Sequence, residues 1–197
     1  MDAKSFAKLF LEFQDQGEAE VAVSPAQWTI YITKRMLEIA NKAEPKLHLC
    51  AESLGSFGGH DEQCHQAKEW LFDFTFYKDE GWNRWGLPLV VVEHENQDRG
   101  NSFHQDLWKV LASFAPLRVM IGYRPQRTAI DCLVASLKQE SEASHWHYPA
   151  DSEDLILIGY RRMDVGDWRV VHRPKGATLS DAFDGSIKDF LSGSPRR

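Results

Sequence analysis

Hydrophobic and polar positions recur along the chain with two different periods, which predicts a protein that combines helices with strands. Apolar residues repeat at three- and four-residue spacing between Phe6 and Phe13, and this pattern predicts a first helix with one apolar face. A second helix is predicted over residues 25–43, where Ser24 is suited to the N-cap and a proline to the first turn. Short apolar runs of strand length follow at residues 46–52, 70–77, 87–95 and 116–123.

The rest of the chain continues to alternate between helical and strand patterns. Ser180 is expected to cap the last helix, and Phe114 to face the core at the end of an earlier one. We therefore predict an α/β fold, with one domain over residues 1–192, a central mixed β-sheet flanked by helices, and a disordered tail at 193–197. The predicted elements are helices over residues 101–114 and 127–142, a hairpin of residues 154–161 and 168–173, and a helix over residues 178–191.

Acidic residues occupy two of the predicted strands, at positions where valine or isoleucine would be usual. Asp73 lies among aromatic residues in the first of these strands, and Glu93 and Glu95 end the second. Successive side chains of a strand point to opposite faces, so Glu93 and Glu95 share one face with Val91. Because a short polar connection makes neighbouring strands antiparallel, we expect Asp73 to lie beside Glu93.

A pair of buried carboxylates is unfavourable unless a positive group compensates both charges. An ionised acid among Val and Phe side chains loses its hydration, and a second acid beside it raises the cost. A divalent cation bound by both acids would remove this conflict, and carboxylate oxygens suit Mg²⁺ or Mn²⁺. In the alternative interpretation Glu93 and Glu95 mark the exposed end of a strand, although the aromatic neighbours of Asp73 favour the metal site.

This arrangement of acids and elements resembles that of a known enzyme family. An acid in one strand, the triplet Glu93-His94-Glu95 at the end of the next, and then a helix and another strand are similar to the PD-(D/E)XK nuclease superfamily. The resemblance covers about residues 27–124 and implies a restriction-endonuclease-like fold. By this match Asp73 is the motif aspartate, Glu93 the middle acid and Glu95 the residue at the position usually held by lysine. The resemblance implies hydrolysis of phosphodiester bonds with Mg²⁺ or Mn²⁺.

The acid at position 95 departs from the usual motif, which changes where the positive charge is expected. Some restriction enzymes of the superfamily have glutamate there, and in some branches a basic residue lies on the following helix instead. The resemblance therefore makes Lys109 the substitute, with a surface lysine as the alternative. It also suggests Glu38 as an accessory acid, whose alternative is a solvated glutamate paired with Lys34, and Arg99 as a phosphate contact.

Composition and charge are those of an ordinary globular domain rather than of a protein that coats nucleic acid. The chain has 197 residues, 43% of them hydrophobic, and a net charge of -6, so contact with nucleic acid would depend on local basic groups. No signal-peptide pattern or apolar run of transmembrane length occurs, so we expect a cytoplasmic protein without membrane contact. The cysteines lack CxxC spacing, which favours reduced thiols. Zinc is not favoured, because Cys50, His60, Cys64 and His65 form only one ligand cluster.

Two functions of different classes follow from these observations. In the first, the chain is a metal-dependent nuclease that acts on nucleic acid, with Asp73, Glu93 and Glu95 as metal ligands. In the second, a nuclease-like fold no longer cuts and serves as a binding or interaction module, which the acidic charge and the missing motif lysine favour. An enzyme requires Asp73 and Glu93 for metal binding, whereas a binding module tolerates alanine at both. Restriction-type enzymes often form homodimers, and the resemblance leaves this open.

Overall fold

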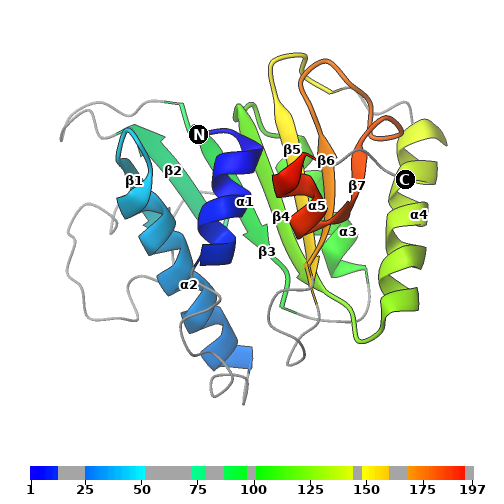
Figure 1. The fold of residues 1–197 in the computed structure, drawn as a ribbon, viewed down its shortest axis with the longest axis horizontal. Coiled ribbons are helices and arrows are strands. Elements are labelled where there is room, and N and C mark those ends of the chain that lie inside the picture. The colour runs from blue at the N-terminus through cyan, green and yellow to red at the C-terminus, as the bar shows by residue number, and fades with distance from the viewer. Residues whose placement is uncertain are drawn as a thin grey trace.

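Seven strands form one mixed β-sheet, and their order across the sheet is the same as their order along the chain (Figure 1). The computed structural model describes residues 1–12, 25–51, 72–78, 87–96, 101–143, 148–159 and 168–193. β3 is parallel to β4 and β4 to β5, whereas the four outer pairs are antiparallel. The predicted α/β class with a central mixed sheet is thereby confirmed. The strands are β1 (Leu47–Ala51), β2 (Phe74–Lys78), β3 (Val90–His94), β4 (Leu117–Tyr123), β5 (Glu153–Gly159), β6 (Arg169–Arg173) and β7 (Phe183–Ser186).

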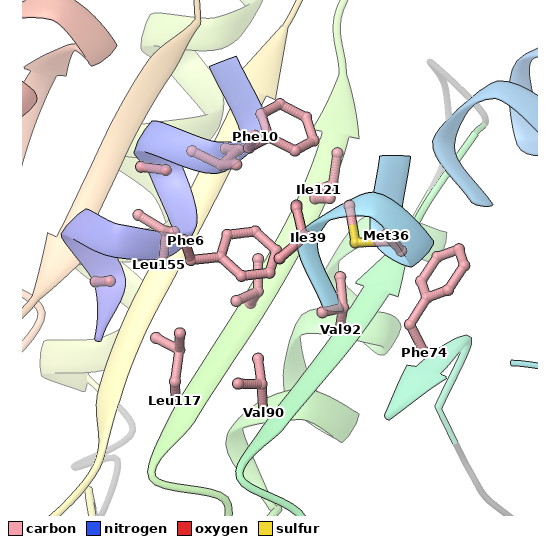
Figure 2. Close-up of a cluster of buried hydrophobic side chains, with 14 of the residues drawn as sticks. Phe6, Phe10, Met36, Ile39, Phe74, Val90, Val92, Leu117, Ile121 and Leu155 are labelled. Carbon is pink, nitrogen blue, oxygen red and sulfur yellow. The ribbon is translucent and has the colours of Figure 1, made fainter. Parts of the chain in front are cut away.

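Helices cover both faces of the sheet, so the fold has three layers (Figure 1). α1, α2 and α5 pack on one face, and α3 and α4 on the other. In the first core, Phe6 of α1 and Ile39 of α2 lie over Val90 and Val92 of β3 (Figure 2). The helices are α1 (Ala3–Glu12), α2 (Pro25–Lys42), α3 (Ser102–Leu111), α4 (Arg127–Ala143) and α5 (Ile187–Ser192).

The alternation of side chains along β3 decides which of its groups meet α3. Val90 and Val92 belong to the core beneath α1 and α2, whereas Val91 packs against Val110 of α3. Glu93 follows in the phase of Val91, so its side chain projects toward the layer that contains α3. The Glu93 side chain therefore lies on the face of the sheet that the strand period predicted.

The C-terminal segment differs from its prediction, because the strand β7 occupies residues 183–186 of the expected helix. β7 pairs antiparallel with β6, and α5 begins only at Ile187. Without β7, the backbone groups of β6 would form an unpaired edge, so pairing outweighs helical preference here. The N-cap is Ser186, whose Oγ accepts a hydrogen bond from the Asp189 N–H at 3.1 Å, instead of the predicted Ser180. Apart from Gly193, the predicted disordered tail lies outside the described residues.

Two other boundaries differ from the prediction and affect the candidate site. β2 begins at Phe74, so Asp73 directly precedes the strand instead of lying within it. α3 ends at Leu111, and Phe114 is 87% exposed instead of facing the core. The helical period that predicted a buried Phe114 does not apply, because the chain has already left the helix at this position.

A buried ion triad joins three neighbouring strands on the side of α3 and α4. Asp154 of β5 lies between Arg118 of β4 and Arg173 of β6, and it accepts a hydrogen bond from the Nε of each arginine. All three side chains are almost completely buried. Arg118 Nη1 also donates to the Leu111 carbonyl at 2.5 Å, and Arg173 Nη2 donates to the Ser152 carbonyl at 2.9 Å. The triad therefore links the end of α3 and the start of β5 to the centre of the sheet.

Replacement of Asp154 by alanine is expected to lower the free energy of unfolding by about 3–5 kcal/mol, because two buried arginines would lose their counter-charge. Urea denaturation monitored by circular dichroism measures this change. Asp151→Ala is the matched control, since Asp151 is exposed and close in sequence, and its expected effect is below about 0.5 kcal/mol. Equal effects of the two substitutions would contradict a structural role for the triad.

Candidate functional site

Asp73 and Glu93 meet where β2 and β3 run side by side. Phe74 lies opposite Val92 in this antiparallel pair, so one further step places Asp73 opposite Glu93. The backbone N–H of His94 donates a hydrogen bond to Asp73 Oδ2 at 2.9 Å. Asp73 is exposed as a residue, but its carboxylate is turned toward β3, where it contacts the backbone of the residue that follows Glu93. The structure thus brings together the two acids that the sequence analysis paired.

Lys109 reaches the same place from α3. Its Nζ lies 2.6 Å from Glu93 Oε1, and the Glu93 side chain is 2% exposed, against 35% for Lys109. Leu107 and Val110 bury the core face of α3, which leaves Lys109 at the edge of that face. The aliphatic stem of lysine allows the ammonium group to extend from this edge toward the sheet. The structure therefore places the lysine suggested by the family resemblance against the central acid.

A further acid, Asp106, joins this group and was not foreseen from the sequence. It precedes Lys109 by three positions on α3, so the two side chains lie on the same side of the helix. Burial raises the pKa of Asp106, Lys109 opposes the increase, and the charges of Glu95 and Asp73 add to it. Asp106 therefore lies close enough to the acids of the sheet to affect their ionisation. The signal available in the sequence was an acid three positions before the candidate lysine.

We call these four acids and the lysine the carboxylate site, and burial raises the pKa of three of the acids, Asp73, Glu93 and Asp106. Burial raises the pKa of Glu93 to about 8, the charge of Asp73 raises it as well, and Lys109 opposes the shift. Burial also raises the pKa of Asp73, against the His94 N–H bond, which lowers it. Near neutral pH Glu93 consequently keeps a proton that an ordinary carboxyl group would release. A bound cation would compensate the same charges. The members are Asp73, Glu93, Glu95, Asp106 and Lys109.

The donor set of the carboxylate site fits a hard divalent cation that keeps part of its water shell. In the described parts of the chain, no three Asp, Glu, His or Cys side chains are grouped as a metal-ligand set. Asp73 and Glu93 are nevertheless adjacent, and Mg²⁺ commonly binds through one or two carboxylates together with water and substrate phosphate oxygens. These two acids would therefore supply the protein ligands. Glu95 is buried at the end of β3, where its backbone N–H donates to the Ile121 carbonyl at 2.9 Å.

His94 lies between the two acids of the triplet, and its contacts link the end of β3 to Asp73 and to β4. Its backbone N–H holds Asp73, and its ring Nε2 lies 3.0 Å from the hydroxyl oxygen of Tyr123 on β4. Tyr123 belongs to the core beneath α1 and α2, so the imidazole lies on the face opposite Glu93. The spacer residue thus positions the acids through the backbone, and its side chain contacts the opposite layer.

Glu38, the accessory acid suggested by the family resemblance, is not brought to the carboxylate site. Glu38 is exposed on α2, which covers the opposite face of the sheet. Near the start of α2, Thr29 accepts a hydrogen bond from Asn96 at 3.1 Å, but Glu38 lies nine positions further along the helix, about 14 Å by the helical rise. Arg99 lies outside the described residues, as do His60, Cys64 and His65 of the disfavoured zinc cluster.

No protein-family model, curated protein or solved structure matches this chain significantly. The function is therefore inferred from the geometry and chemistry of the chain itself. Among the described helices, none is both long enough and apolar enough to cross a membrane.

Substitution of Glu93 by glutamine is expected to stabilise the metal-free protein at alkaline pH. The folded-state pKa of Glu93 is about 8, above the ordinary value of 4.5, so the folded state binds more protons than the unfolded state between these values. Wild-type stability therefore falls as pH rises through this window. Glutamine cannot ionise, so at pH 9 the variant should be more stable by about 1–3 kcal/mol.

Urea denaturation at pH 6 and pH 9 in the presence of a chelator measures this difference. Glu38→Gln is the matched control, because Glu38 is exposed on the opposite layer and its substitution should leave the pH dependence of the wild type intact. A Glu93→Gln variant that follows the same pH dependence as the wild type would contradict the buried, proton-retaining state of Glu93.

Proposed function

We propose that this protein is a metal-dependent nuclease that hydrolyses phosphodiester bonds of nucleic acid. The observation that carries the proposal is the convergence of Asp73 and Glu93 across β2 and β3 with Lys109 from α3. Two adjacent acids and a cationic side chain are the groups needed to bind a metal ion and a phosphate together. These three residues are among the four that the PD-(D/E)XK resemblance assigned to the reaction, the fourth being Glu95.

The arrangement of elements around these residues supports the same proposal. α2 is followed by the antiparallel strands β1, β2 and β3, and α3 then leads to β4, which is parallel to β3. This order is the layout on which the resemblance to a restriction-endonuclease-like fold was based, and the acids lie at the corresponding strands. Family resemblance and local chemistry therefore favour the same reaction class, the first through the order of the elements and the second through the contacts of the same residues.

Each residue of the carboxylate site has a separate role in the proposed hydrolysis. A Mg²⁺ or Mn²⁺ ion held by Asp73 and Glu93 would lower the pKa of bound water and stabilise negative charge on the phosphate. Lys109 is placed to neutralise the phosphate oxygens. For this, its ammonium group must leave the Glu93 carboxylate and pair with the phosphate of the substrate. Glu95 and Asp106 lie close enough to influence each other, and either carboxylate is suited to orient the attacking water and accept its proton.

The glutamate at position 95 is compatible with this mechanism because Lys109 supplies the missing positive charge. A carboxylate cannot neutralise phosphate, so a chain with Glu95 alone would lack that component of the motif. Lys109 Nζ is 2.6 Å from Glu93 Oε1, and this distance supports a role for a lysine on α3 at the proposed reacting centre. In this proposal the positive charge comes from the neighbouring helix and not from the motif position itself.

Asp73→Asn is expected to weaken Mn²⁺ binding by about 10- to 100-fold, because it removes a charged ligand. Lys109→Met should leave Mn²⁺ affinity unchanged or raise it, since the ammonium group competes for Glu93, while cleavage falls by about 10²- to 10³-fold. Isothermal titration measures the first effect. Cleavage of labelled single-stranded and duplex DNA and RNA with Mn²⁺ measures the second.

Lys8→Met is the matched control for the lysine substitution, because Lys8 is exposed on α1 and should change neither quantity. The proposal fails if the folded wild type neither binds Mn²⁺ nor cleaves any of the four substrates. It also fails if Asp73→Asn cleaves as fast as the wild type, because the activity would then come from elsewhere.

An interaction module without catalysis is the second candidate, and one observation favours it. Trp108 and Phe114 are 65% and 87% exposed beside the carboxylate site, and exposed aromatic groups are common at binding surfaces. In that case the acids would have no catalytic task, and alanine at both Asp73 and Glu93 would be tolerated. The metal and cleavage measurements above separate this candidate from the nuclease.

A further inference from the structure

An apolar cleft of about 420 Å³ opens directly beside the carboxylate site. Its walls include Phe72, Leu87, Trp108 and Phe114, with Lys109 on its rim. Pockets of about 300–1,000 Å³ that are lined mainly by apolar and aromatic groups commonly hold small organic moieties. The cleft is therefore large enough for an aromatic group of a substrate.

Lys109 connects the cleft to the carboxylate site. The same side chain lines the cleft and places its Nζ 2.6 Å from Glu93. Phe72, which also lines the cleft, directly precedes Asp73 in the chain. A group bound in the cleft would therefore lie next to a second group of the same ligand that occupies the space between Asp73 and Lys109.

Exposure and charge identify the kind of ligand that this cleft would take. Leu87 and Phe114 are more than four-fifths exposed, and Trp108 is 65% exposed, so large apolar surfaces remain in contact with water. Among the described lining residues, Lys109 is the charged one, and Gln105 and Ser113 add neutral polar groups. An aromatic ring attached to an anionic group matches both properties, because the ring covers the apolar surface while the anion meets the ammonium group.

We propose that the cleft holds an unpaired nucleobase of the strand whose phosphate meets Lys109, so that the preferred substrate is single-stranded or locally unpaired nucleic acid. This inference rests on the proposed nuclease function and specifies its substrate. Trp108 and Phe114 provide rings on which a base can stack, and such stacking accepts every base because each has a π-face. Inside a duplex the faces of a base are covered by its neighbours, so only an unpaired base can enter the cleft.

The test measures cleavage of a labelled single-stranded oligonucleotide with Mn²⁺, together with the duplex of the same sequence. A series of single strands, each with one abasic site at a different position, locates the base that enters the cleft. One abasic position should lower kcat/KM by about 5- to 150-fold, which is the range expected from loss of one stacked base. The intact single strand should be cleaved faster than the duplex.

Trp108→Ala should lower cleavage of the intact strand by a similar factor and abolish sensitivity to that abasic position. Trp108→Phe should restore both, because phenylalanine retains a stacking face, and Phe114→Ala provides a second truncation of the same surface. Mn²⁺ affinity should remain unchanged in all three variants, since none of them removes a carboxylate. Leu37→Ala is the matched control, because Leu37 is an exposed apolar residue on α2, in the opposite layer.

The outcomes separate this inference from the function on which it rests. If cleavage depends on Asp73 but is the same for every abasic position, or is unaffected by Trp108→Ala, the cleft does not bind a base. The nuclease proposal would remain intact in that case. A change from dimer to monomer in Trp108→Ala, with cleavage unchanged, would assign the cleft to contact between two copies of the chain and also overturn the inference. Absence of both Mn²⁺ binding and cleavage in the wild type would overturn both proposals.

Discussion

The parallel pairing of β3 with β4 is the constraint on which the candidate site depends. Parallel neighbours cannot be joined by a tight turn, so the chain must cross one face of the sheet between them, and α3 makes this crossing. The crossing brings Lys109 to Glu93. Arg118, the second residue of β4, donates to the Leu111 carbonyl at 2.5 Å and so holds the end of α3 to the sheet through the buried ion triad.

The carboxylate site is unfavourable for the stability of the metal-free fold, and this is a physical reason to regard it as functional. Burial and mutual repulsion raise the pKa values of Asp73, Glu93 and Asp106 together, and one lysine cannot balance all of them. The Arg118–Asp154–Arg173 triad is different, because Asp154 pairs with both arginines and each arginine also donates to a backbone carbonyl group. In the proposed function a bound cation would offset the repulsion within the carboxylate site, whereas in the triad Asp154 already lies between two positive groups.

α3 contributes to two adjacent surfaces, one polar and one apolar. Asp106 and Lys109 belong to the carboxylate site, and Trp108, between them in sequence, lines the cleft together with Lys109. Asp106 and Lys109 are three positions apart and therefore share a side of the helix, and Trp108 lies in the same turn. One turn of α3 thus contributes to both surfaces. A substrate that carries an anion and an aromatic ring a short distance apart would contact both at once, which is the chemistry of a nucleotide.

Helical and strand periods by themselves determined most elements and the phase of β3, because these periods follow from local backbone geometry. They also predicted the antiparallel pairing that sets Asp73 beside Glu93, because this placement follows from two consecutive strands and the alternation of side chains along them. Only the tertiary structure decided the place of Asp106, the exposure of Phe114 and the formation of β7, since these depend on where α3 lies and which strand edge lacks a partner. The contact of Lys109 with Glu93 is likewise set by the packing of α3 against the sheet. The local pattern of the helix or of the strand alone does not predict this contact.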